Sequence, residues 1–170
     1  VVSINLPQIG ILAHGDEQKF WALFDERLQL CYEALMCRHN ALIGVKSDVS
    51  PVHWQYGAIA RLKKGETIDK FLTGGYSTIS LGYIGLYELT KLMKGCSHTA
   101  SEGTEFALKV MQYMKNKCAV WKEQTGIGFA LYGTPAESLC YRFARIDKER
   151  FGTIPDVTDK GYYTNSYHVD

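Results

Sequence analysis

The sequence predicts an α/β fold in which parallel strands form a layer or a barrel. Short runs rich in β-branched and aromatic residues begin near positions 1, 78 and 127. Each run is followed by a longer segment in which apolar residues recur every three or four positions, the spacing of an amphipathic helix. Strands that alternate with helices in this way favour a parallel sheet covered by helices.

The first expected strand covers residues 1–6, and Pro7 either closes it or places it near a sheet edge. A long helix is expected from Asp16, a good N-cap residue, to about Gly44. Its apolar positions share one face, which we expect to be core. They are Phe20, Leu23, Phe24, Leu28, Cys31, Leu35 and Leu42.

The middle of the chain predicts irregular structure over 45–66, interrupted by short helices. We expect these short helices at 58–62 and 66–72. A strand pattern begins at Thr78 and changes to a helical one near Ile84, and that helix is expected to continue to Met93 and stop at Gly95.

The last third predicts a helix, a strand and a second helix. Ser101 or Thr104 is the expected cap of the first helix, and Gly126 is its expected end. The three expected elements cover residues 105–123, 127–132 and 135–150. A loop flanked by short extended pieces is expected over 157–168.

Composition is that of one ordinary globular domain: 170 residues, 46% hydrophobic and 22% charged. The net charge of +1 provides no field that would attract nucleic acid or an anionic membrane. No apolar run reaches the ~20 residues of a membrane span, and no basic-then-apolar leader is visible. The chain begins inside a strand pattern and without Met, so we expect it to be a piece of a longer protein.

The cysteines predict buried, reduced thiols in a cytoplasmic protein rather than a metal site. They are Cys31, Cys37, Cys96, Cys118 and Cys140. Their number is odd, and none forms a C-x-x-C pair. The nearby Cys/His pairs lack second pairs at ligand spacing, which argues against zinc within this chain.

The most informative local pattern is the turn between the last expected strand and the last expected helix. Thr134 suits an N-cap, Pro135 the first helical position, and Glu137 the third residue of a capping box. A helix start at a strand end also exposes unpaired N–H groups and a positive dipole, which together can bind an anion. The hydroxyl groups of Thr134 and Ser138 add donors. The local pattern alone leaves both interpretations open and favours the purely structural one.

Four strings, taken together and in order, resemble the anaerobic (class III) ribonucleoside-triphosphate reductases, which are glycyl-radical enzymes. They are residues 1–7 (VVSINLP), 79–88 (ISLGYIGLYE), 134–139 (TPAESL) and 157–168 (VTDKGYYTNSYH). The resemblance covers essentially the whole chain. It implies a ten-stranded α/β barrel with long helices packed outside, of which residues 1–170 form roughly the second half.

The resemblance also implies the chemistry. A glycyl radical, installed by a separate activase that uses S-adenosylmethionine and an iron–sulfur cluster, passes to a cysteine, and the resulting thiyl radical reduces the ribose of a ribonucleoside triphosphate. Formate is the expected reductant, ATP and deoxynucleoside triphosphates are the expected effectors, and the enzyme is expected to be a homodimer. The radical cysteine and the effector site are expected before residue 1, and the glycyl loop and a structural zinc after residue 170. No catalytic residue is therefore expected in this segment.

The TPAESL turn matches the substrate phosphate-binding loop of that family, which reverses the preference stated for the local pattern. The role carries over to Thr134, Ala136, Glu137 and Ser138, with Glu137 acting mainly through its backbone N–H. Gln8 departs from the family, which usually has Arg at this position.

A polar cluster near the end of the chain supplies candidates for lining the nucleotide cavity: Asn165, Ser166 and His168. A solvated or capping role for these residues is equally compatible with the pattern. Two other functions stay open for the chain as a whole. One is a non-catalytic phospholigand-binding α/β module, and the other is a fragment of another glycyl-radical enzyme.

Overall fold

A three-stranded parallel sheet forms the centre of the computed structural model, which describes residues 1–165. Its strands are β1 (Val2–Asn5), β2 (Thr78–Ile84) and β3 (Gly128–Gly133), in the order β1-β2-β3. The register places Ile4 beside Tyr83 and Leu81 beside Leu131. The α/β class and the parallel pairing predicted from the sequence are therefore confirmed.

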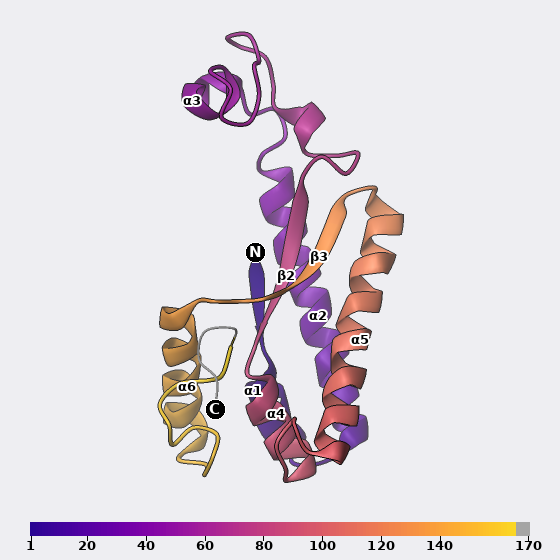
Figure 1. The fold of residues 1–170 in the computed structure, drawn as a ribbon, viewed down its shortest axis with the longest axis vertical. Helices are drawn as coiled ribbons and strands as arrows, with labels where there is room; N and C mark the ends of the chain where they lie inside the picture. Colours follow the sequence, from indigo (N-terminus) through magenta and orange to yellow (C-terminus); the bar gives the residue numbers. More distant parts are fainter. Residues whose placement is uncertain (166–170) are drawn as a thin grey trace.

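Two long helices, α2 (Glu17–Asn40) and α5 (Ser101–Thr125), pack along the sheet (Figure 1). Their inward faces form the main core with side chains of β1 and β2. The buried members contributed by α2 and α5 are Phe20, Phe24, Leu28, Cys31, Phe106, Val110, Met114, Cys118 and Trp121. Burial of these side chains supplies most of the hydrophobic stabilisation of the sheet.

Helix α1 (Leu6–Ala13) follows β1 directly and was not predicted. β1 ends at Asn5, before Pro7, and is an edge strand of the sheet that residues 1–165 form, as the position of Pro7 suggested. Pro7 lies in the first turn of α1, where its missing N–H costs nothing. The Asn5 side chain caps the helix by accepting a hydrogen bond from the Gln8 N–H (3.3 Å). Helix α1 packs against α4 (Leu86–Lys94), which follows β2 in the same way.

The helix ends show which signals in the sequence were reliable. Gly95 and Gly126 end α4 and α5 with positive φ values of 71° and 69°, as expected. Helix α2 begins at its predicted cap Asp16 but ends at Asn40, so the expectation that Gly44 terminates it is wrong. Helix α5 begins at Ser101 with Ala100 as its N-cap and without a side-chain cap.

Residues 41–77 form a protrusion beyond the amino ends of the strands, at the top of Figure 1. It contains α3 (Pro51–Trp54) and two short 3₁₀ turns, Ser47–Val49 and Asp69–Phe71. The helix expected at 58–62 is absent, and the one expected at 66–72 is reduced to a 3₁₀ turn. Three buried side chains give this protrusion its own small core: Leu62, Ile68 and Leu72.

After β3 the chain crosses over β2 and β1 to reach α6 (Glu137–Phe151), as Figure 1 shows. Helix α6 buries a second apolar cluster with β2, α1 and the C-terminal segment. Its fully buried members include Ile84, Cys140, Ala144, Val157 and Tyr163. No helix among residues 1–165 is both long and apolar enough to cross a membrane.

Candidate phosphate-binding loop

The predicted anion site lies at the edge of the sheet where its parallel strands end. β1 ends at Asn5, β2 at Ile84 and β3 at Gly133, so the β3–α6 loop (residues 134–136) is next to the carboxyl ends of its neighbours. In open parallel α/β sheets, ligands bind at this edge because the loops that follow the strands converge there. The β3–α6 loop therefore lies at the edge where such sheets bind ligands.

The start of α6 has exposed backbone donors and no side-chain cap. The N-cap is Ala136, so the predicted capping box with Thr134 as N-cap is wrong. The N–H groups of Leu139 and Cys140 both bond to the carbonyl of Ala136 at 3.1 Å. Those of Glu137 and Ser138 have no hydrogen-bond partner among residues 1–165, and both residues are exposed. These are the first-turn donors that an anion can satisfy.

Thr134 is buried because it anchors the loop to the sheet. Its Oγ1 lies 2.8 Å from the Ser3 Oγ, and its N–H donates to the Tyr83 carbonyl at 3.4 Å. The contact with Ser3 crosses over Gly82, where a Cβ would lie 2.1 Å from the Thr134 Oγ1. The Thr134 hydroxyl therefore fixes the loop to β1, and the donors that face outward come from Glu137 and Ser138.

Asn165 is the only one of the three cavity-lining candidates that lies within the described residues. Its Nδ2 donates to the Thr134 carbonyl at 2.9 Å, which places it directly against the β3–α6 loop. Ser166 and His168 lie outside the described residues. The structure thus places Asn165 at the predicted site, where its side chain bonds to the backbone of the loop.

A buried carboxylate lies beside this region on α6. Asp147 is fully buried and accepts three hydrogen bonds from neutral donors. The donors are the Asn5 Nδ2 (2.8 Å), the Gln8 Nε2 (2.7 Å) and the Tyr163 hydroxyl (2.9 Å). Gln8, which departs from the family pattern, therefore has a structural partner. Burial, followed by the charge of Asp147, raises the pKa of Tyr163 and keeps its hydroxyl a donor.

A second buried carboxylate, Glu88, lies on α4 and holds the C-terminal segment. The Thr164 N–H donates to its two oxygens at 3.0 and 3.2 Å, and the Thr164 hydroxyl donates at 2.8 Å. The Lys160 ammonium lies 3.2 Å away. Burial raises the pKa of Glu88, while the bonds from Thr164 and the charge of Lys160 oppose this increase.

Sequence reasoning missed both buried carboxylates. Glu88 is 76 positions from Thr164, and Asp147 is 142 positions from Asn5, so no local pattern links them to their donors. For Asp147 the available signal was its position on the same helix face as the apolar residues Cys140 and Ala144. An acidic residue on such a face is almost never buried without partners.

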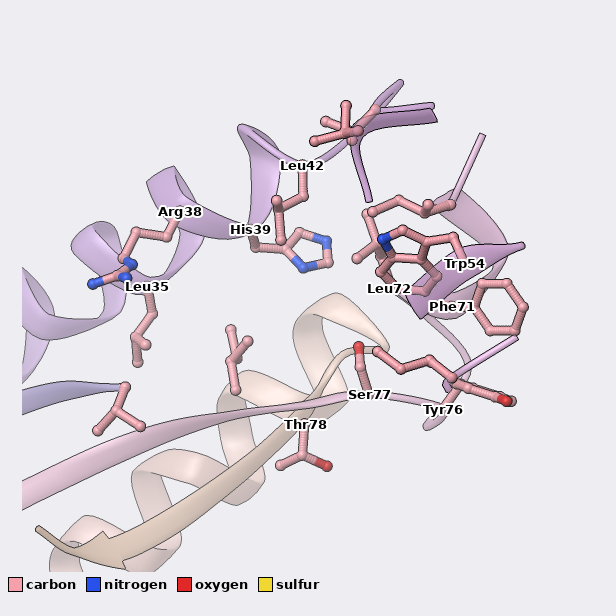
Figure 2. Close-up of a pocket in the computed structure, with 16 residues that line it drawn as sticks. Leu35, Arg38, His39, Leu42, Trp54, Phe71, Leu72, Tyr76, Ser77 and Thr78 are labelled. Atoms are coloured by element: carbon pink, nitrogen blue, oxygen red, sulfur yellow. The ribbon is translucent and has the colours of Figure 1, made fainter. Parts of the chain in front are cut away.

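A separate hollow lies at the amino ends of the strands. A mainly apolar cavity of about 590 Å³ lies between the end of α2, the protrusion and the start of β2. Figure 2 shows His39 and Leu42 facing Leu72 and Trp54 across it. None of the residues that line it belongs to the β3–α6 loop or to α6, so it is not the predicted anion site.

Residues 1–165 contain no group of three or more His, Cys, Asp or Glu side chains arranged to hold a metal ion. The structural zinc that the resemblance implies is therefore not assigned to these residues. The cysteines are all free. Cys31, Cys118 and Cys140 are buried as expected, Cys96 is half-buried, and the expectation of burial is wrong for Cys37, which is exposed.

Fold and site together define a parallel α/β domain in which a loop at the carboxyl ends of the strands leads into a helix start with exposed backbone N–H groups. A family model described as anaerobic ribonucleoside-triphosphate reductase matches residues 1–170. The anaerobic ribonucleoside-triphosphate reductase of phage T4 is 45% identical over 174 residues, which cover 99% of this chain and 27% of the phage protein. The Escherichia coli K12 protein of the same name is 44% identical over 173 residues, or 100% of this chain and 24% of that protein.

The chain belongs to the anaerobic ribonucleoside-triphosphate reductase family, and it spans about a quarter of the length of these relatives. Solved structures share its fold. The anaerobic ribonucleotide reductase from Thermotoga maritima with citrate in the active site has a TM-score of 0.73 to this chain at 19% identity. The match covers 98% of this chain and 29% of the Thermotoga maritima chain. The same enzyme in complex with dATP and CTP also matches 98% of this chain, with a TM-score of 0.71.

Proposed function

We propose that residues 1–170 are part of the catalytic barrel of an enzyme that reduces ribonucleoside triphosphates, and that the β3–α6 loop holds the substrate's phosphates. The observation that carries this proposal is the pair of exposed N–H groups of Glu137 and Ser138, which have no partner among residues 1–165, at the start of the 15-residue helix α6. Family membership supplies the anion, because the relatives are named for a triphosphate substrate.

The loop is suited to a phosphate group on physical grounds. Backbone N–H groups at a helix start are fixed in direction, so little reorganisation accompanies anion binding. The aligned peptide dipoles of α6 add a partial positive charge at the same point. The Ser138 hydroxyl supplies a further exposed donor. Thr134 and Ala136 shape the loop, and the Glu137 side chain is dispensable in this scheme.

The remaining parts of the reaction belong to the whole enzyme. We place the three strands in a ten-stranded barrel, and the radical cysteine, glycyl loop, effector site and structural zinc outside residues 1–170. Formate as reductant, a radical-generating activase, a homodimer and a cytoplasmic location complete the proposal. In this scheme residues 1–170 bind and orient the substrate and form part of the wall of the active site.

The decisive experiment replaces Glu137 with proline or alanine in the full-length enzyme. Proline at the first helical position removes the backbone N–H but keeps the helix, and the extended backbone of Ala136 (φ −100°, ψ 90°) tolerates a following proline. The matched control Glu137→Ala removes the carboxylate and keeps the N–H. We expect Glu137→Pro to weaken CTP binding by about ten- to a hundredfold, the effect of losing one charge-assisted hydrogen bond.

Equilibrium binding needs no radical, so CTP and cytidine are both titrated against the unactivated protein. Glu137→Ala is expected to bind CTP as well as the parent, or slightly better because a negative charge is gone. Neither variant is expected to change the affinity for cytidine, which has no phosphate. Equal CTP affinity in the parent and Glu137→Pro proteins would show that the loop is not the phosphate site.

A further inference from the structure

Two consecutive residues near the C-terminus are each held by a different buried carboxylate. The Tyr163 hydroxyl donates to Asp147 of α6, and the Thr164 N–H and hydroxyl donate to Glu88 of α4. Both carboxylates are fully buried. Buried carboxylates need partners, and displacing these two residues would remove one of the three hydrogen bonds to Asp147 and the three bonds from Thr164 to Glu88. The segment is therefore fixed against the body of the domain.

Further contacts strengthen this attachment. The Thr164 carbonyl accepts a hydrogen bond from the Gly85 N–H at 2.8 Å, at the point where β2 turns into α4. Lys160 forms an ion pair with Glu88, and its ammonium lies 4.5 Å from the centre of the Tyr87 ring. The segment is thus joined to the end of the central strand by backbone as well as side-chain bonds.

The next residue, Asn165, connects the fixed C-terminal segment to the β3–α6 loop. Its Nδ2 donates to the carbonyl of Thr134. The other polar groups of Thr134 are bound within the sheet, by Ser3 and by the Tyr83 carbonyl. Asn165 therefore holds the one remaining polar group of Thr134, on the peptide plane that leads into the loop. The direction of the Thr134–Pro135 peptide influences where the first N–H groups of α6 point.

We propose that Asn165 is a positioning residue for phosphate binding, held in place by Glu88 and Asp147 through residues 163 and 164. This inference rests on the proposed function of the β3–α6 loop. In this arrangement the C-terminal segment and the phosphate loop form one rigid unit. A shift of the chain at residue 165 changes the affinity for the phosphates of a nucleotide and leaves the affinity for its nucleoside part unchanged.

The test uses the full-length enzyme with Asn165→Ala and the conservative variant Asn165→Gln, which keeps the amide donor. Hydrogen–deuterium exchange is followed in peptides that cover residues 133–140, and binding is measured with CTP and with cytidine. We expect Asn165→Ala to speed exchange in the loop and to raise the Kd for CTP about three- to tenfold, the range for one lost hydrogen bond. The Kd for cytidine should be unchanged, and Asn165→Gln should recover part of the CTP affinity.

Two results would overturn the inference. One is loop exchange in Asn165→Ala that matches the parent, because the bond to Thr134 would then not order the loop. The other is an equal loss of affinity for CTP and cytidine, which a general structural role would give. Failure of the proposed function has a different signature. In that case Glu137→Pro leaves CTP binding intact, while Asn165→Ala still speeds exchange, so the loop is ordered by Asn165 but does not hold phosphate.

Discussion

At the scale of single residues, the five cysteines differ in burial, and three of them have a raised thiol pKa. Burial raises the pKa of Cys31, Cys118 and Cys140 to about 11. For Cys140 the nearby charge of Glu88 acts in the same direction. The thiolate is the nucleophile, so each of these residues is almost entirely unreactive at pH 8. For Cys31 the charge of Arg27 opposes the increase, but burial has the larger effect.

Alkylation of the native full-length protein at pH 8 tests the low reactivity of the three buried thiols. The three buried thiols should react at least about two hundredfold more slowly than a free thiol of pKa ~8.5, from their thiolate fraction alone. Their rates should rise about tenfold per pH unit between pH 8 and 10, because the thiolate fraction rises in proportion. Mass spectrometry of digested samples measures each site, with urea-unfolded protein as the control. Fast labelling of any of the three in the native state would contradict the described burial.

Residue-level prediction from the sequence succeeded where one residue determines the local geometry. Gly95 and Gly126 were correctly identified as helix ends, because each adopts the positive φ that favours glycine. It failed at Thr134, whose hydroxyl binds Ser3 from a strand 131 positions away and is therefore not available as a helix cap. Long-range competition for a side chain is not visible in a local motif.

At the scale of elements, Gly82 of β2 lies under the contact that joins β1 to the β3–α6 loop. A Cβ there would lie 2.5 Å from the Ser3 Oγ and 2.1 Å from the Thr134 Oγ1. A methyl group would therefore separate the two hydroxyls that join β1 to the β3–α6 loop. Glycine at this position allows the loop to lie close to the central strand.

We expect Gly82→Ala to destabilise the domain by about 1–3 kcal/mol, the usual effect of overpacking a well-packed site. The control Ser3→Ala breaks the same hydrogen bond without a clash and should cost only about 0.5–1.5 kcal/mol. Thermal unfolding of the full-length variants measures the difference, which should appear as a larger fall in Tm for Gly82→Ala. A Gly82→Ala protein as stable as Ser3→Ala would mean that the strands separate without strain.

The order of helices and strands was predictable, but their connections were less so. Periodicity identified α2, α4, α5 and α6, because each buries a continuous apolar face. Helix α1 was missed because Pro7 was interpreted as the end of a strand, although an Asn-x-Pro start is equally a helix N-terminus. In the protrusion, packing of Trp54 against Phe71 stabilises structure that periodicity does not encode.

At the scale of the whole molecule, the sheet has two strands that pair on one side only. Among residues 1–165, β1 and β3 each pair with β2 and with no other strand. Successive N–H groups of a parallel strand point to alternate sides, so about half of the amides in β1 and β3 face away from β2. A row of unpaired N–H and C=O groups at a sheet edge is usually paired or covered, which agrees with further strands on both sides, as the proposed barrel requires.

Hydrogen–deuterium exchange of the full-length enzyme tests that closure. If the sheet continues on both sides, all amides of β1 and β3 should exchange as slowly as those of β2, because each has a partner. The internal reference is the stretch Leu81–Tyr83 of β2, which pairs with β1 on one side and with β3 on the other. Rapid exchange of about half the amides of β1 or β3, with β2 still protected, would show an open sheet edge. The ten-stranded barrel would then be wrong, while the loop that follows β3 would keep its place at the carboxyl ends of the strands.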